Sequence, residues 1–236
     1  MIELAAIVEG QTEQTFVQDH LAAHLTGLGI AIWARLPGRA VRRGGVRPWE
    51  SVRGDILRTL RERRGRICTT MFDFYAMPPD WPGRADASGM PLENKGSHVE
   101  QAILDDLAEH AGDDFRPELF IPYVQVHEFE ALLFANVATM AETLAPVCPT
   151  GAEHLGRQFQ AILDAAGEGG AEAINDGRET CPSRRITGLV RAYRKPLYGP
   201  MIAGRIGLGI LRTACHHFGQ WLSRLETLAQ LPESPS

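Results

Sequence analysis

The chain has 236 residues, of which 44% are hydrophobic and 22% are charged, so it can bury a globular core and is not expected to be disordered. Its formal net charge of -5 argues against a protein coated with basic surface, although local arginines can still bind phosphates. The four cysteines are too widely scattered for a zinc knuckle, a redox pair or a disulfide framework. The N-terminus lacks the basic n-region of a signal peptide, and its apolar run is too short for one. No run of about eighteen apolar residues occurs, so we expect a cytoplasmic protein without a membrane span.

The first 135 residues alternate between strand and helix patterns. Short apolar runs predict strands at 2–8, 30–36, 67–75 and 119–126. Between them, apolar residues at helical spacing predict a helix capped by Thr12, then helices at 49–64 and 99–110, and another starting at 131–134. The connections at 39–48, which is basic, and at 76–97, which is rich in Pro, Gly and Asp, are expected to be loops. This alternation is typical of an α/β fold with a mostly parallel sheet flanked by helices.

The pattern changes after residue 135. Residues 153–166 and 201–229 are expected to be helical, and 167–200 to be rich in loops and basic side chains. We therefore predict an α/β domain at 1–135 and a helical, loop-rich C-terminal extension at 136–236 that packs on it.

Acidic residues follow three of the four predicted strands. Glu9 ends the first strand, Asp73 lies at the end of the third, and Glu128 and Glu130 follow the fourth. Parallel strands bring their carboxyl ends to one edge of a sheet, where clustered carboxylates repel one another unless a cation or protons neutralise them. A single acid at a strand end is usually solvated or caps a helix. The shared position of these acids predicts instead a site for a hard divalent cation, Mg²⁺ or Mn²⁺.

Other side chains leave a functional and a structural interpretation open. Glu13 lies in a first helical turn, where the helix dipole favours an acid, so a structural role is as well supported as a catalytic one. His127 is either a ligand or proton shuttle or a hydrogen-bonded structural residue. Two basic groups are expected to contact phosphates, although any one cation can be ordinary solvated charge. They are Arg42, Arg43 and Arg47 in the basic loop, and Arg184, Arg185 and Lys195 in the C-terminal part.

Several segments together resemble a bacterial family known as domain of unknown function 4276. They are IVEGQTEQTFV, TTMFDFYAMP and PYVQVHEFEALLF, followed by INDGRETCPSRRI, YRKPLYGPMIAGRIGL and CHHFGQWLSRL, so the resemblance covers nearly the whole chain. That family is in turn similar to Toprim domains, which occur in topoisomerases, primases and the overcoming-lysogenization-defect nucleases. Its relatives are often encoded near ABC-type ATPases in phage-defence clusters.

The resemblance implies a Toprim-like sheet and a role for each acid. Glu9 would be the general acid or base, and Asp73 would be the first residue of a metal-chelating Asp-x-Asp motif. This motif reads Asp73-Phe74-Tyr75, so its second aspartate is missing. Metal binding would then depend on Glu128 and Glu130, or the site would be weak or inactive.

Two functions from different classes follow. One is a Mg²⁺- or Mn²⁺-dependent nuclease that cleaves DNA or RNA and acts with an ABC-type ATPase against phage, with Glu9, Asp73 and Glu128 catalytic and Glu130 a further metal ligand. The other is a catalytically inactive, Toprim-like binding subunit of an ATPase complex. Hydrolysis of a small phosphoester is a third possibility. The sequence leaves open the choice between DNA and RNA, between endo- and exonucleolytic cleavage, the partner and the oligomeric state.

Overall fold

The computed structural model describes residues 1–38, 47–112, 115–126, 128–174 and 180–230. Its internal contacts divide the chain into two compact units, Met1–Val126 with Trp221–Ser236, and His127–Gln220. The sequence predicted a boundary after residue 135 and a single C-terminal extension. The structure divides the chain earlier, because the acids that follow the fourth strand contact residues of the second unit, and it returns the chain end to the first unit. The predicted packing of the extension on the sheet domain stays a prediction.

The first unit contains a parallel sheet with the strand order β2-β1-β3-β4, in which β5 also pairs with β3. The parallel pairing confirms the prediction from the strand–helix alternation. In the register of the two central strands, Val8 of β1 lies opposite Met71 of β3, so the carboxyl ends of these strands are neighbours. The strands are β1 Ile2–Val8, β2 Ile30–Arg35, β3 Ile67–Asp73, β4 Phe120–Ile121 and β5 Val124–Gln125.

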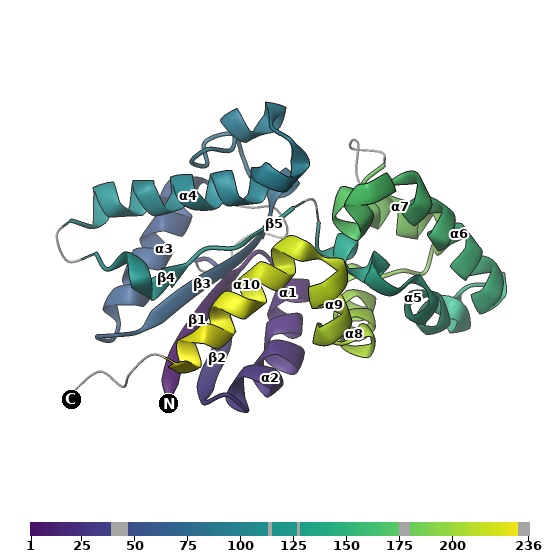
Figure 1. Ribbon diagram of the computed structural model, residues 1–236, viewed down its shortest axis with the longest axis horizontal. Coiled ribbons are helices and arrows are strands. Elements are labelled where there is room, and N and C mark those ends of the chain that lie inside the picture. The colour runs from purple at the N-terminus through teal and green to yellow at the C-terminus, as the bar shows by residue number, and fades with distance from the viewer. Residues whose placement is uncertain (39–46, 113–114, 127, 175–179, 231–236) are drawn as a thin grey trace. The chain divides into compact units, whose positions relative to one another are not determined.

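Helices cover both faces of this sheet (Figure 1). The helices α3 and α4 pack on one face, where Ile56 and Ile103 join the same buried cluster as Cys68 and Phe72 of β3. The other face carries the helix that follows β1 and the end of α10 (Figure 1). The helical segments are α1 Gln11–Phe16, the π-helical turn Val17–Leu21, α2 Ala22–Thr26, α3 Trp49–Arg61, α4 Leu92–Ala111, the short 3-10 turn Pro117–Leu119, α10 His216–Thr227 and the 3-10 turn Leu228–Gln230.

Trp221 attaches the end of α10 to the sheet. Its ring stacks on Tyr123 with centroids 4.4 Å apart, and its indole Nε1 donates a hydrogen bond of 2.9 Å to Oγ1 of the buried Thr69. Buried Trp side chains contribute large apolar area and require a partner for their N–H group, and both conditions are met here. The last part of the chain is therefore an integral component of the sheet unit.

Two segments of the first unit differ from the sequence prediction. The fourth strand, expected at 119–126, is interrupted into β4 and β5 around Pro122, which has no N–H to donate to a ladder. The expected long loop at 76–97 is packed into the core, because Trp81 is 2% exposed and its ring lies 5.0 Å from Phe72. This segment contains the 3-10 turns Phe74–Ala76 and Asp86–Gly89, and α4 begins within it at Leu92.

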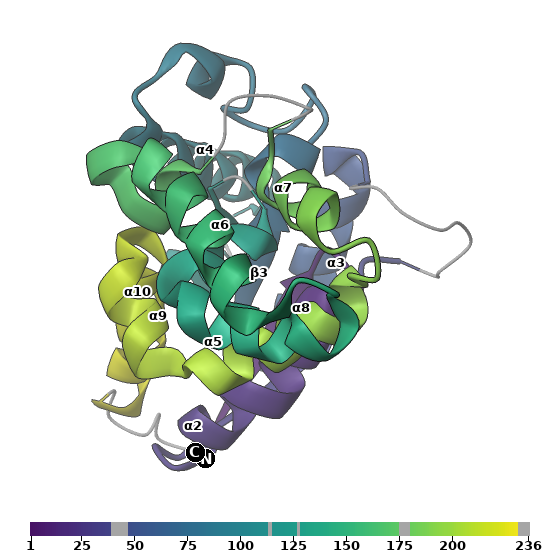
Figure 2. The ribbon, with the colours of Figure 1, turned by 90° about the vertical axis from the view of Figure 1, so that its right-hand side faces the viewer.

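The second unit is helical, as its sequence predicted, and Figure 2 shows its helices α5 to α8. An edge-on contact between Phe134 and Phe159, 5.8 Å between centroids, is part of its core. The stretch 167–200 is more helical than expected, because it contains a 3-10 helix, α7 and the start of α8. Pro182 is compatible with α7 because it stands in the first turn, where no N–H donor is needed. The elements are the 3-10 helix Phe129–Asn136, α5 Val137–Leu144, the turn Ala145–Val147, α6 Gly151–Ala165, the 3-10 helix Gly167–Ala173, α7 Pro182–Leu189, α8 Lys195–Ile206, α9 Leu208–Ala214 and the beginning of α10.

Among the helices that the structure describes, none combines the length and the apolar character needed to cross a bilayer.

Candidate functional site

Glu9 and Asp73 meet at the carboxyl edge of the sheet. The backbone N–H of Glu9 donates to the carbonyl oxygen of Met71 at 3.1 Å, which extends the pairing of β1 with β3 by one residue. The carboxylate of Glu9 accepts a hydrogen bond of 3.0 Å from the backbone N–H of Asp73. The structure therefore brings together the two acids that the sequence placed at the ends of the first and third strands.

Glu13 lies in the first turn of α1, three residues after Gly10. Its side chain reaches back toward Gly10, the N-cap of α1, because a Cβ atom at Gly10 would lie 3.3 Å from Oε2 of Glu13. The side chains of Glu13 and Asp73 are both only 2% exposed. Burying a carboxylate is unfavourable unless its charge is compensated, so each of these two acids requires a compensating interaction.

The position of the missing second aspartate has an unexpected environment. Tyr75 is 43% exposed, and two cations that the sequence reasoning did not single out, Arg84 and Lys95, lie close to its ring. The guanidinium carbon of Arg84 and the ammonium nitrogen of Lys95 are each 5.9 Å from the ring centroid. Positive charge at this distance opposes a divalent cation at position 75, so the replacement changes the electrostatics of the position as well as removing a ligand.

In the second unit, Glu128 caps a helix. Its two carboxylate oxygens accept hydrogen bonds from the backbone N–H of Ser183 at 3.0 Å and from the Ser183 hydroxyl at 3.1 Å. Ser183 lies in the first turn of α7, where backbone N–H groups have no partner within the helix and negative charge is favourable. These contacts give Glu128 a structural role in addition to the predicted catalytic one.

Glu130 forms a buried ion pair. Its side chain is fully buried, and its carboxylate oxygens contact the ammonium group of Lys195 at 2.9 Å and the hydroxyl of Tyr193 at 3.1 Å. Burial, reinforced by the negative charge of Glu130, raises the pKa of Tyr193 far above its usual value, so the phenol keeps its proton and donates a hydrogen bond to the carboxylate. Lys195, expected to contact phosphates, is thus held by an acid that is sixty-five positions away in the sequence.

The remaining predicted cations are placed separately. Arg184 is exposed, and Arg185 is half-buried and donates from Nε to the carbonyl oxygen of Thr180 at 2.7 Å. The predicted phosphate contacts of these residues stay predictions. Arg42, Arg43 and His127 lie outside the residues that the structure describes.

With this geometry in place, a comparison with family models becomes informative. The model of the family described as domain of unknown function 4276 (DUF4276) matches residues 8–226. The chain belongs to the DUF4276 family. The match covers most of both units and includes every predicted site residue, and it confirms the resemblance seen in the sequence.

Two solved structures are similar to this DUF4276 chain. The C-terminal region of the Burkholderia pseudomallei OLD protein is 14% identical with a TM-score of 0.50, and the match covers 96% of this chain and 98% of that chain. The C-terminal region of the Xanthomonas campestris pv. campestris OLD protein is 13% identical with a TM-score of 0.46, and covers 96% and 95% of the two chains. At this identity the Burkholderia likeness concerns the fold alone, and the fold is the α/β class with a parallel sheet flanked by helices that the sequence predicted. A search among curated proteins finds no match.

The acids of the DUF4276 chain fit part of a metal site. Glu9 and Asp73 offer carboxylate oxygens at one edge, and Mg²⁺ is commonly bound through one or two carboxylates while it keeps several waters. Over the described parts of both units, no three His, Cys, Asp or Glu side chains are grouped closely enough to hold a metal ion. Glu128 and Glu130 belong to the second unit, so their participation with Glu9 and Asp73 stays a prediction.

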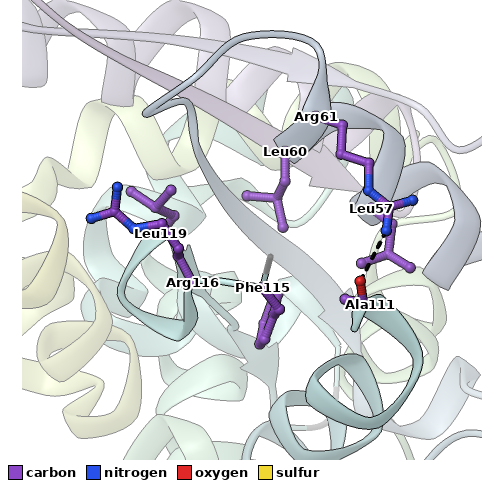
Figure 3. A pocket seen from close by; sticks show the side chains of 7 residues that line it. All are labelled: Leu57, Leu60, Arg61, Ala111, Phe115, Arg116 and Leu119. Carbon is purple, nitrogen blue, oxygen red and sulfur yellow. Dashed lines mark hydrogen bonds between the residues drawn. The ribbon is translucent and has the colours of Figure 1, made fainter. Parts of the chain in front are cut away.

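A pocket of about 190 Å³ lies elsewhere in the first unit (Figure 3). It lies where α3 and α4 end and just before β4 begins, and in it Arg61 donates to the carbonyl oxygen of Ala111 at 3.1 Å. The acids follow the carboxyl ends of β1 and β3, so this pocket is separate from them. Its lining residues are Leu57, Leu60, Arg61, Ala111, Phe115, Arg116 and Leu119.

Proposed function

We propose that this chain is a Toprim-like, Mg²⁺- or Mn²⁺-dependent nuclease that cleaves phosphodiester bonds in DNA or RNA. The observation that carries the proposal is the contact between the Glu9 carboxylate and the backbone N–H of the buried Asp73 at the carboxyl edge of the parallel sheet. Ligands of open parallel sheets bind outside this edge. A buried acid beside a second acid at this edge would be stabilised by a bound cation.

The proposal assigns a role to each predicted residue. Glu9 would act as general acid or base, since its carboxylate stands at the strand end and is fixed by the Asp73 N–H group. Asp73 would hold the metal together with Glu9, and Glu128 and Glu130 would complete the site. Mg²⁺ or Mn²⁺ would supply activation of water and stabilisation of charge on the phosphodiester. Arg184, Arg185 and Lys195, with Arg42 and Arg43, would contact the phosphates of the strand.

The family resemblance supports a wider setting for this activity. We propose that the chain is the effector of an anti-phage system in which an ABC-type ATPase is its partner. In that setting the ATPase would control access of nucleic acid to the acids of the first unit.

A second function is favoured by one specific observation. Tyr75 and its two neighbouring cations stand where the second carboxylate of the Asp-x-Asp motif would be. An inactive, Toprim-like binding subunit of the ATPase complex would tolerate this replacement, because binding nucleic acid does not require a complete metal site.

A cleavage assay separates the two functions. The purified chain, alone and with any ABC-type ATPase encoded beside it, is incubated with single- and double-stranded DNA and RNA in Mg²⁺ or Mn²⁺. A nuclease converts at least one of these substrates to shorter products, and EDTA stops the reaction. Intact substrates in every combination, together with retained binding, would establish the binding subunit instead.

A further inference from the structure

The segment that follows β3 gathers two cations and two aromatic rings. The guanidinium carbon of Arg84 lies 4.0 Å from the ring centroid of the buried Phe74, and the ammonium group of Lys95 lies 5.7 Å from it. The rings of Phe74 and Tyr75 meet edge to face with centroids 5.3 Å apart. Tyr75 is the exposed member of this group, so one aromatic ring borders solvent with two positive charges each 5.9 Å from its centroid.

Among the residues that the structure describes, no carboxylate forms an ion pair with Arg84 or Lys95. Arg84 donates from Nε to the Phe74 carbonyl oxygen at 2.9 Å and from a terminal nitrogen to the Ser88 hydroxyl at 3.0 Å, both neutral acceptors. No ion pair within the described ranges includes Arg84 or Lys95. Burial lowers the pKa of Arg84, which is the direction expected for a cation that is partly removed from water without a compensating acid.

Lys95 adds a second reason to expect an anion. It lies in the first turn of α4, a helix of twenty residues whose N-cap, Pro91, offers no side-chain hydrogen bond. The first turn of α4 already holds Glu93, whose charge suits the positive end of the helix dipole, whereas a lysine in this turn is electrostatically unfavourable. An anion near Lys95 would relieve this second effect.

The backbone that leads to Arg84 is packed against the core and α4. Trp81 donates from its indole Nε1 to the carbonyl oxygen of Arg47 at 2.9 Å within the core. Gly83, which has a φ angle of +69°, packs so closely on α4 that a Cβ atom would lie 2.8 Å from Cβ of Ala102. Arg84 follows directly, and Figure 1 shows this segment folded over the beginning of α4. Groups that are already fixed lose little entropy on binding, which favours a binding site over a flexible surface.

We propose that Tyr75, Arg84 and Lys95 form a subsite for one unpaired nucleotide of a nucleic acid strand. The base stacks on the exposed Tyr75 ring, and the adjoining phosphate binds between the two cations. Aromatic stacking combined with positive charge is the usual means by which proteins hold single strands, and a paired base cannot offer its face in this way. The inference rests on the proposed function and narrows its substrate to single-stranded or locally unpaired nucleic acid, delivered directly beside Asp73.

The test measures binding without metal, so that it is independent of cleavage. Fluorescence anisotropy of a labelled oligothymidylate is recorded in EDTA with the full chain and its variants. Tyr75→Leu is expected to weaken binding by about 5- to 100-fold, the range that stacking of one base supports, whereas Tyr75→Phe keeps near wild-type affinity. An abasic strand of the same length is expected to bind weakly to wild type and to be insensitive to Tyr75→Leu.

The cations are tested by the salt dependence of the same measurement. Lys95→Ala is expected to reduce the slope of log K against log salt by about 0.7, the value for one phosphate contact on a single strand. The matched control is Arg64→Ala, an exposed cation that precedes β3 at the opposite end of the strand, and it should leave the slope unchanged. Unchanged oligothymidylate binding by Tyr75→Leu overturns the subsite, as does a Lys95→Ala slope equal to that of Arg64→Ala. If binding follows these expectations but no substrate is cleaved when Mg²⁺ or Mn²⁺ is present, the subsite stands and the proposed nuclease activity is rejected.

Discussion

Substitution of Lys195 tests whether this cation mainly binds nucleic acid or mainly stabilises the fold of the second unit. If its main role is to bind nucleic acid, its removal should leave folding unaffected; if it neutralises Glu130, its removal should destabilise the unit. The ammonium group lies 2.9 Å from a carboxylate with no exposed side-chain surface. Removing one partner of a fully buried pair costs about 3–5 kcal/mol, because the other charge is left uncompensated. The Lys195 side chain is 33% exposed, and solvent screening reduces the expected cost of Lys195→Met to roughly 2–3 kcal/mol.

Urea unfolding followed by far-ultraviolet circular dichroism measures this cost, since the second unit is helical. The matched control is Arg205→Met, which removes a cation from an exposed pair in the same unit. Its nitrogen is 3.9 Å from Glu142, and the two side chains are 51% and 64% exposed. We expect this control to cost less than about 1 kcal/mol. Adding Glu130→Gln to Lys195→Met should recover part of the lost stability through coupling of about 1–3 kcal/mol. Equal stabilities of Lys195→Met and Arg205→Met would refute the buried-pair argument.

Two further predictions concern metal and pH. Mg²⁺ or Mn²⁺ at a hundred times its dissociation constant should stabilise the chain by about 2.7 kcal/mol, which differential scanning calorimetry detects as a rise in Tm. This rise should be smaller in Asp73→Asn and unchanged in the surface variant Asp19→Asn. Equal rises in wild type and Asp73→Asn would contradict metal binding at Asp73. The hydrogen bond from Arg35 is the main cause that lowers the pKa of Glu62 below its usual 4.5. The Arg35–Glu62 pair therefore stabilises the fold fully above pH 4.5, and this stabilisation is lost as the pH falls through the lowered pKa of Glu62. Glu62→Gln should therefore be less stable than wild type at neutral pH, with the difference shrinking in acid unfolding titrations below pH 4.5, and a constant difference would exclude this linkage.

The parts of the fold that could be predicted depend on local periodicity. The apolar runs before Glu9 and Asp73 identify buried strands, and alternation with helices requires those strands to be parallel. The proximity of these two acids then follows from the topology, without any knowledge of tertiary contacts. The buried residues Phe16, Val17, Leu21 and Leu25 similarly follow from helical spacing, although Thr12 lies inside the helix and Gly10 is its N-cap.

The parts that could not be predicted depend on contacts between distant residues. The pairing of Glu130 with Lys195 and of Glu128 with Ser183 leaves no local signal, because an acid in a helix cap and an acid at a metal look alike in sequence. The Pro- and Gly-rich stretch 76–97 has the composition of a loop, yet buried residues place it in the core, namely Met77, Trp81 and Ala87. Arg84 and Lys95 were missed for that reason, since a cation in an assumed loop gives no indication of its neighbours.

The rate of strand cleavage by Glu9→Gln tests the central claim most directly. This substitution keeps the size of the side chain and an oxygen that can accept from the Asp73 N–H group, but it removes proton transfer. The rate is measured at saturating nucleic acid with Mg²⁺ or Mn²⁺ and with any ATPase partner present, and Asp19→Asn serves as the matched control for loss of a surface acid. We expect Glu9→Gln to bind nucleic acid like wild type and to cleave it about 10²- to 10⁴-fold more slowly, with Asp19→Asn unaffected. Cleavage by Glu9→Gln at the wild-type rate would contradict the assignment of the catalytic acid or base to the carboxyl edge of the sheet.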